Sequence, residues 1–124
     1  MRIAIIGAPR AGKTTLALEL ARTRHLRVVH ADDLARLGWS AASDEIARLI
    51  ATPADLIIEG VAVVRGLRKA LETPGPPVEC CIVLERPRSP LSRGQLAMAR
   101  GCETVLRQIE AELVGRGVRL ERPS

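Results

Sequence analysis

The sequence predicts an α/β fold in which helices alternate with the strands of a mainly parallel sheet. Two observations support this prediction: short apolar runs alternate with longer amphipathic stretches, and a glycine-rich turn joins the first run to the first stretch. Such alternation is typical of βαβ units, in which each pair of parallel strands is connected through a helix. The 124 residues are expected to form one domain, 1–124.

The amino-terminal half is expected to contain three strands and two helices. Apolar runs predict strands near Ile3–Ile6, Arg27–His30 and Leu56–Ile58. Amphipathic stretches between these runs predict helices near Lys13–Arg24 and Asp44–Ile50. Strand and helix therefore follow one another in the order that parallel pairing requires.

The carboxyl-terminal half continues the same alternation. A helix is expected near Val61–Glu72 and a strand near Cys80–Leu84, separated by the proline- and glycine-rich stretch Thr73–Pro77. A last helix is expected near Glu103–Gly115, followed by a last strand near Gly117–Leu120.

The composition is that of a globular protein with an aliphatic core. Hydrophobic residues make up 47% of the chain, yet Trp39 is the only aromatic residue. The three cysteines are an odd number, which argues against a disulfide framework. No apolar run approaches the length of a membrane span, and the first residues show no signal-peptide pattern. We therefore expect a cytoplasmic protein without a membrane partner.

The chain is basic, with a formal net charge of +5 carried by seventeen arginines and two lysines. Arginine suits phosphate recognition because its planar guanidinium group donates two parallel hydrogen bonds. The excess of positive charge favours an anionic partner, either a nucleotide or a nucleic acid. For most surface arginines, however, genomic base composition is the preferred explanation.

The most specific motif is the turn after the first predicted strand. The pattern G-x-x-x-x-G-K-T is matched by Gly7-Ala8-Pro9-Arg10-Ala11-Gly12-Lys13-Thr14, and Thr15 follows it. In this pattern, the P-loop, glycines let backbone N–H groups turn toward phosphate oxygens, and the following helix terminus adds further donors. Lys13 can reach the β- and γ-phosphates of a nucleoside triphosphate, and the Thr14 hydroxyl can bind Mg²⁺. Residues 7–15 are therefore expected to bind ATP or GTP together with Mg²⁺.

Acidic residues follow the second and third predicted strands, at the sheet edge where parallel sheets bind ligands. Asp32 and Asp33 are placed where a carboxylate can accept the proton of an attacking hydroxyl and support Mg²⁺. We favour Asp32, nearest the strand end, while Asp33 suits the first turn of a helix. Glu59 ends the third strand like a Walker B acid and is expected to help hold the metal. An ordinary strand-end acid is the alternative.

A segment rich in arginine, proline and glycine, about residues 86–101, lies between the fourth predicted strand and the last predicted helix. Its composition suits a mobile lid that closes over the phosphates, excludes water and neutralises developing charge. We expect Arg86 and Arg93 to take part in catalysis and Arg88 to contact the nucleotide. Each of them, like Arg100, could equally be a solvated surface residue.

Two residues after the tandem acids are candidates for binding the phosphoryl acceptor. Arg36 follows Asp33 by one helical turn and could hold an acceptor phosphate. Trp39 could stack on a base, although a lone tryptophan is more often a hydrophobic cover. His25 and His30 have no convincing partner in the sequence.

Together these motifs resemble the small P-loop kinases, a broad group that includes nucleotide, shikimate and polynucleotide kinases. The resemblance covers residues 7–15, Asp32-Asp33 with Arg36, Ile57-Ile58-Glu59-Gly60 and the arginines after Leu84. It implies a three-layer sandwich with strand order 2-3-1-4-5 and helices on both faces of the sheet. It also implies that the acid after the second strand serves as base or Mg²⁺ partner, and that lid arginines touch ATP.

From the motifs and the resemblance we expect an ATP- and Mg²⁺-dependent kinase that transfers the γ-phosphoryl group to a hydroxyl. The stretch between the second and third strands leaves little room for the acceptor-closing insertion of nucleoside monophosphate kinases. Together with the positive charge, this favours a hydroxyl carried on nucleic acid, including a hydroxymethylated base in DNA. Two alternatives stay open: a kinase of nucleosides, nucleotides or metabolites, and a nucleotide-dependent switch or NTPase module without an acceptor.

Overall fold

The computed structural model describes residues 1–123. Its five strands form one sheet in the order β2-β3-β1-β4-β5, and all neighbours are parallel, which confirms the predicted fold class. The strands are β1 (Arg2–Gly7), β2 (Arg27–His30), β3 (Leu56–Glu59), β4 (Cys80–Leu84) and β5 (Arg119–Glu121). The helices are α1 (Lys13–Arg24), α2 (Trp39–Ala51), α3 (Val63–Ala70) and α4 (Arg93–Gly115), and a 3-10 segment, η1, spans Ala31–Leu37.

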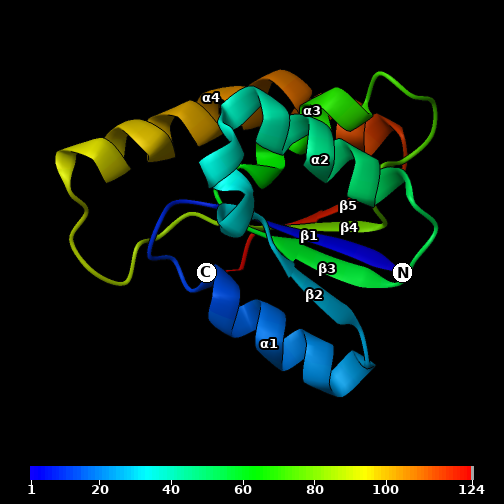
Figure 1. The fold of residues 1–124 in the computed structure, drawn as a ribbon, viewed down its shortest axis with the longest axis horizontal. Helices are drawn as coiled ribbons and strands as arrows, with labels where there is room; N and C mark the ends of the chain where they lie inside the picture. The colour runs from blue at the N-terminus through cyan, green and yellow to red at the C-terminus, as the bar shows by residue number, and fades with distance from the viewer. Residues whose placement is uncertain (124) are drawn as a thin grey trace.

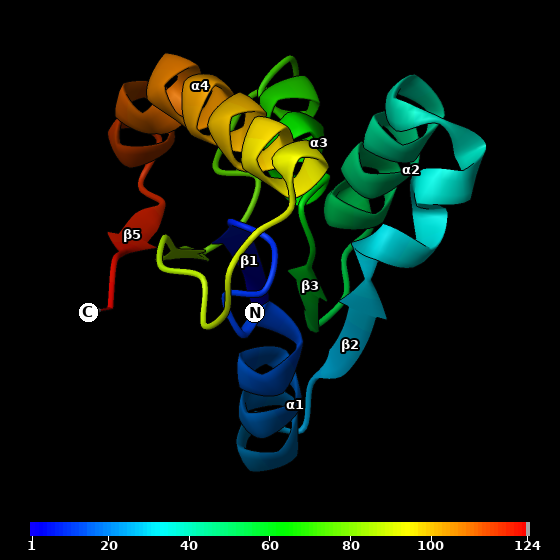
Figure 2. The same ribbon diagram turned by 90° about the vertical axis from the view of Figure 1, so that its left-hand side faces the viewer.

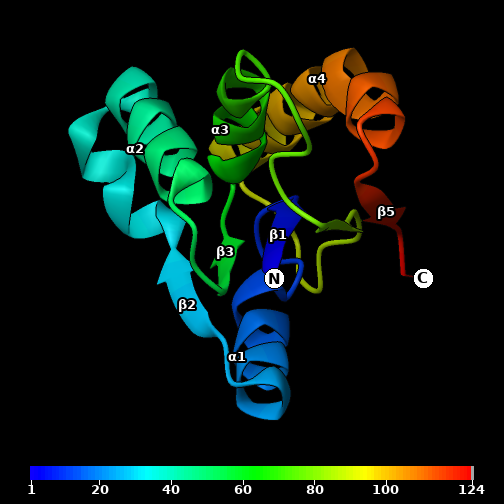
Figure 3. The ribbon, with the colours of Figure 1, turned by 90° about the vertical axis from the view of Figure 1, so that its right-hand side faces the viewer.

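The sheet lies between two layers of helices (Figure 1). α2, α3 and α4 cover one face, whereas α1 packs alone against the other, and the views from either side show the same three layers (Figures 2 and 3). Because every strand pair is parallel, the carboxyl ends of the strands meet at one edge of the sheet. The loop between β1 and α1 begins at that edge.

Each face of the sheet has its own aliphatic core. Side chains of β1 alternate between the two, so that Ile6 belongs to the larger core under α2, α3 and α4 and Ile5 to the smaller core over α1. Cys81 and Cys80 divide in the same way, as their adjacency in a strand predicts. Because both faces of the sheet are covered, the central strands are continuous apolar runs in the sequence.

The largest departure from the sequence prediction is the start of α4. The sequence predicts this helix from Glu103, but it begins at Arg93. The Ser92 side chain accepts a hydrogen bond from the backbone N–H of Gln95, and the Gln95 side chain accepts one from the backbone N–H of Ser92. This reciprocal cap starts the helix early. The prediction that Arg93 and Arg100 lie in an irregular lid is therefore wrong.

Glycines explain why the helix starts were missed. Gly94 and Gly101 lie inside α4, where their low helix propensity masks the helical pattern. Gly38 directly precedes α2, which begins at Trp39 rather than at Asp44. No helix within residues 1–123 is both long enough and apolar enough to cross a membrane.

Candidate active site

The loop between β1 and α1 packs tightly against the end of β4. Gly7 has a φ of +137°, and a Cβ atom there would lie 2.0 Å from the carbonyl oxygen of Leu84. The backbone N–H of Ala8 donates a hydrogen bond of 3.2 Å to the same carbonyl. Arg10 and Gly12 then adopt positive φ values of 59° and 89°. Turns of this kind direct successive N–H groups inward, which suits the binding of a phosphate group.

Lys13, the first residue of α1, is buried, with only 6% of its surface exposed. Its ammonium group donates a hydrogen bond of 2.5 Å to the carbonyl oxygen of Ala8. It forms no ion pair with any carboxylate of residues 1–123. Burial lowers the pKa of Lys13, and the charges of Asp32 and Glu59 oppose this shift only in part. A buried cation without a carboxylate partner is suited to binding an anion.

Glu59 ends β3 and is only 2% exposed. Its Oε2 atom accepts a hydrogen bond of 2.6 Å from the hydroxyl of Thr14 and lies 3.0 Å from Nδ1 of His30. The sequence offers His30 no partner, but the register of β2 against β3 sets it opposite Glu59. Thr14 and Glu59 together present the oxygen ligands that Mg²⁺ prefers.

A metal at this position would depend on ligands from outside the protein. Residues 1–123 contain no cluster of three or more His, Cys, Asp or Glu side chains able to hold a metal ion. Mg²⁺ commonly binds through one or two protein groups and completes its shell with water and substrate phosphates. Thr14 and Glu59 fit that pattern.

Asp32 and Asp33 are neighbours in the chain but differ in their surroundings. The Oδ1 atom of Asp32 accepts a hydrogen bond of 3.0 Å from the backbone N–H of Val61. Gly60 permits this contact, because its φ is +140° and a Cβ there would lie 2.8 Å from the same oxygen. Both side chains are exposed in η1, but Asp33 does not line the cavity beside Lys13 that Asp32 lines.

One cavity of about 640 Å³ brings together residues of the predicted nucleotide-binding loop and the predicted base, metal and acceptor residues. It is lined by Pro9, Arg10, Ala11, Gly12, Lys13, Thr14, Thr15, Asp32, Trp39, Glu59, Val61, Gln95 and Met98. Gln95 and Met98 come from the first turns of α4, and the sequence reasoning missed them because it placed this segment in a loop. The cavity thus joins the loop, the ends of β2 and β3, and α4.

Two of the predicted arginines lie beside the loop. The backbone N–H of Arg88 donates a hydrogen bond of 2.8 Å to the carbonyl oxygen of Arg10. A Cβ at Gly12 would lie 2.7 Å from the guanidinium carbon of Arg88, so the side chain rests directly on the loop. Arg86 and Arg88 also line, with Thr15, a second hollow of about 410 Å³ beside α1.

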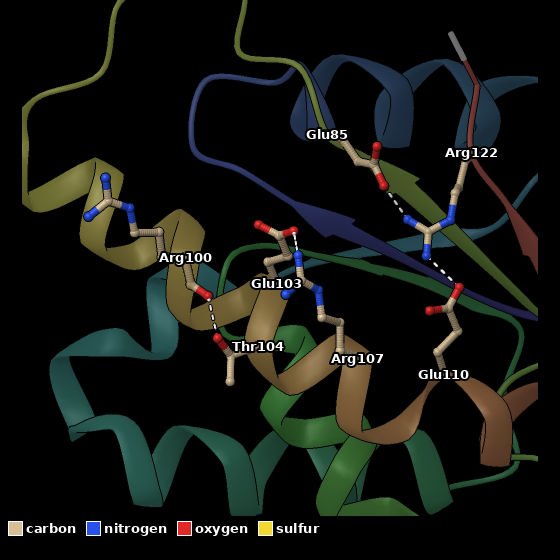
Figure 4. A network of polar contacts seen from close by, with 7 residues as sticks. All are labelled: Glu85, Arg100, Glu103, Thr104, Arg107, Glu110 and Arg122. Carbon is tan, nitrogen blue, oxygen red and sulfur yellow. Dashed lines mark hydrogen bonds and ion pairs between the residues drawn. The ribbon is translucent and has the colours of Figure 1, made fainter.

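The remaining predicted arginines lie elsewhere. Arg36 and Arg93 are exposed and are not among the residues that line the cavity beside Lys13. Arg100 is exposed on α4, where Figure 4 shows its side chain directed away from the neighbouring polar network. That network joins the residue after β4, helix α4 and the segment after β5 through Glu85, Glu110 and Arg122.

Trp39, the predicted acceptor contact, begins α2 and lines the same cavity as Lys13 and Asp32. It is 45% exposed, so it is not a buried hydrophobic cover. The guanidinium group of Arg65 lies over its ring, 5.0 Å from the ring centre. Arg65 belongs to α3, so this contact joins α3 to the start of α2.

Comparison with known proteins finds similarity only among solved structures, since no family model and no curated protein matches the chain. The shikimate kinase from Acinetobacter baumannii in complex with shikimate matches with a TM-score of 0.60 and 14% identity, covering 99% of this chain and 83% of that one. The shikimate kinase from Aquifex aeolicus vf5 matches with a TM-score of 0.54 and 17% identity, covering 93% of this chain and 97% of that one. The chain therefore has the α/β fold of the small P-loop kinases, as its motifs imply.

Proposed function

We propose that this protein is an ATP- and Mg²⁺-dependent phosphotransferase that transfers the γ-phosphoryl group to a hydroxyl of a small molecule. The proposal depends most on Lys13, whose buried ammonium group has no carboxylate partner within residues 1–123. This group lies in one cavity with Thr14, Glu59 and Asp32. A phosphate-binding cation, a metal-binding pair and a proton acceptor are the parts that phosphoryl transfer needs.

The loop and Lys13 fit the polyphosphate of ATP or GTP. The left-handed residues Arg10 and Gly12 turn the backbone, and the amino terminus of α1 contributes unpaired N–H donors. Phosphate charge would offset the cost of burying the Lys13 ammonium, whose only hydrogen-bond partner within residues 1–123 is the carbonyl oxygen of Ala8. Arg88, resting on Gly12, adds a second positive charge beside the loop.

Thr14 and Glu59 are the proposed metal-binding residues. Mg²⁺, when bound, neutralises charge on the transferring phosphoryl group. The contact with His30 holds the Glu59 carboxylate in the direction of Thr14. Asp32 lies in the same cavity and could support the metal shell from the acceptor side.

Asp32 is the proposed general base. Its Oδ1 atom is occupied by the backbone N–H of Val61, which fixes the orientation of the carboxylate. The other carboxylate oxygen can then accept the proton of an acceptor hydroxyl. Asp33, outside the cavity lining, is left with the role of stabilising the start of η1.

The acceptor is proposed to be a small molecule rather than a nucleic acid. The sequence favours a nucleic acid because the chain is basic and the stretch between its second and third strands is short. Neither of the two similar structures supports a DNA acceptor. The two similar structures reported above are shikimate kinases, and one of them is bound to shikimate. The cavity volume of about 640 Å³ is also typical of a small-molecule site.

Transfer of label from γ-labelled ATP to separate pools of metabolites, nucleosides, nucleotides and DNA tests this proposal. We expect Mg²⁺-dependent labelling of a small molecule and none in the Lys13→Ala variant, with circular dichroism confirming that the variant is folded. Labelling of DNA alone would show that the acceptor is a nucleic acid rather than a small molecule. Slow hydrolysis that no pool stimulates would instead indicate a nucleotide-dependent switch.

A further inference from the structure

Helix α4 forms part of the wall of the candidate active site and continues behind it. Gln95 and Met98 line the cavity that contains Lys13 and Asp32. Cys102 lies on the same side of α4, one turn beyond Met98, because residues three and four apart share a helix face. It is buried and borders a separate cavity of about 360 Å³. This face of α4 therefore runs from the candidate active site into the core.

The thiol of Cys102 is bonded to the segment that joins β3 to α3. It donates a buried hydrogen bond of 3.1 Å to the backbone carbonyl oxygen of Val61. Val61 lies just before α3, and no backbone N–H within residues 1–123 donates to its carbonyl. The thiol is thus the donor that satisfies this buried oxygen, which would be costly to leave unpaired.

The N–H group of the same residue is bonded to the proposed base. It donates a hydrogen bond of 3.0 Å to Oδ1 of Asp32. Cys102 and Asp32 are therefore joined through Val61, the thiol at its carbonyl and the carboxylate at its N–H. Val61 is itself buried, and close-packed interiors transmit small displacements. A shift of the Val61 backbone would consequently displace the Asp32 carboxylate.

The surroundings of Cys102 keep it a donor within reach of Val61. Burial raises the pKa of its thiol, so the proton is retained at neutral pH. The charges of Lys13 and Asp32 also act on this thiol, which therefore lies near the candidate active site. α4 approaches α3 closely here, since a Cβ at Gly101 would lie 2.9 Å from a side-chain nitrogen of α3. A side chain as short as cysteine can then span the gap.

We propose that Cys102 is a positioning residue, which holds the proposed general base in place through the backbone of Val61. The inference rests on the proposed function, because it assigns to this thiol the orientation of Asp32 for proton transfer. Cys102 does not line the candidate active site, so it acts on Asp32 only through Val61. A ligand that moves α4 through Gln95 or Met98 would also move this support.

Hydrogen exchange of the Val61 amide, measured by NMR, tests the connection without any turnover. Cys102→Val removes the donor, and the adjoining cavity has room for the added methyl group. We expect the Val61 amide to exchange about tenfold faster in this variant. Rates are expressed relative to the Leu71 amide, which is bonded to the Leu67 carbonyl at the end of α3. This reference corrects for a general loss of stability.

Two further variants separate the hydrogen bond from the packing. Cys102→Ser keeps a donor for the Val61 carbonyl and should restore the relative exchange rate to within about twofold of the original. Cys81→Ala is the matched control, because it removes a buried thiol of the same core but leaves both bonds of Val61 intact. It should lose stability without faster relative exchange. Should Cys102→Val fail to fold, Cys102→Ala takes its place with the same expected result.

The kinetic test uses the acceptor that becomes labelled in the experiment described above. Cys102→Val should lower kcat about tenfold, as misplacement of a catalytic group does, and Cys102→Ser should recover most of the loss. The Kd for a non-hydrolysable ATP analogue with Mg²⁺ should stay within about twofold, since the nucleotide is held by other residues. In the Asp32→Asn background, Cys102→Val should lower kcat no further, because one residue acts through the other.

Three results would overturn the inference: an unchanged relative exchange rate of Val61 in Cys102→Val, no recovery in Cys102→Ser, or an equal fall in kcat with and without the Asp32 carboxylate. Failure of the proposed function looks different, since no pool would be labelled or Asp32→Asn would transfer normally. The exchange measurement would still show whether the thiol holds Val61.

Discussion

The hydroxyl of Thr14 donates a hydrogen bond of 2.6 Å to the carboxylate of Glu59, although Thr14 lies in the first turn of α1 and Glu59 ends β3. The contact follows from the topology, because β3 is paired with β1 and its end reaches the loop that follows β1. His30 approaches the same carboxylate from β2. Helix α1 and the neighbouring strands β2 and β3 thus supply the parts of the proposed metal site.

Replacing His30 with alanine removes the nitrogen atom that lies 3.0 Å from Oε2 of Glu59. We expect the Mg²⁺ concentration needed for half-maximal binding of a fluorescent ATP analogue to rise about 10-fold, a typical effect of losing a partner of a metal ligand. His30→Asn should recover most of this loss, since its amide nitrogen can take the place of Nδ1. An unchanged Mg²⁺ requirement in His30→Ala would show that Glu59 needs no support from β2.

Gly60→Ala should destabilise the fold and displace the Asp32 carboxylate. The new Cβ would lie 2.8 Å from Oδ1 of Asp32, at a φ of +140°. Gly75→Ala is the matched control, because Gly75 has a φ of +93° with no atom within 4 Å of the added Cβ. Backbone strain costs roughly 1–3 kcal/mol in either variant.

Urea unfolding of the two glycine variants separates the cost of backbone strain from the cost of the steric clash with Asp32. We expect Gly60→Ala to lose about 1 kcal/mol more than Gly75→Ala, because overpacking adds to the strain. Phosphoryl transfer should fall only in Gly60→Ala. If both variants lost the same stability and Gly60→Ala kept full activity, the close packing of Gly60 against Asp32 would not be needed for phosphoryl transfer.

Asp32→Asn should abolish phosphoryl transfer while sparing nucleotide binding. The asparagine oxygen can still accept the hydrogen bond from the N–H of Val61, so the local fold is retained, but an amide cannot accept a proton as a carboxylate does. A fall in kcat of about 10²–10⁴-fold is expected for loss of a general base. Undiminished transfer in this variant, or its loss in Asp33→Asn alone, would assign the base to another residue.

The stability of the nucleotide-free protein should depend on pH through Lys13. Burial holds the pKa of Lys13 below its ordinary value of 10.5, so the unfolded chain binds more protons between the lowered value and 10.5. Folding is therefore favoured as the pH rises through this window. Relative to Lys13→Met, the original protein should gain thermal stability as the pH rises from the lowered pKa toward 10.5, measured as the difference between their Tm values. A difference that does not change with pH would contradict the burial of a charged amine.

Much of the fold could be predicted because its signals are local. The apolar runs of β1, β3 and β4 predict buried strands, and the glycine spacing of residues 7–14 marks the turn between β1 and α1. The strand order came from the resemblance rather than from the pattern, and the structure confirms it. The early start of α4 was missed because Ser92 and Gln95 form their cap ahead of a helix weakened by glycine.

The contacts that the sequence did not reveal join residues far apart in the chain. The predicted strand order makes β2 and β3 neighbours, but it does not give the register that sets His30 opposite Glu59. Arg65 and Trp39 meet because α3 packs against α2, and no spacing in the sequence predicts that approach. Site residues on strand ends are therefore easier to infer than those on helix faces.

Calorimetric titration with a non-hydrolysable ATP analogue tests the central claim, that the loop after β1 and the buried Lys13 hold a nucleoside triphosphate together with Mg²⁺. We predict saturable binding that EDTA weakens by roughly tenfold, about 1.4 kcal/mol, and that Lys13→Ala weakens further. A folded protein that binds neither ATP nor GTP analogues in the presence of Mg²⁺ would contradict the claim.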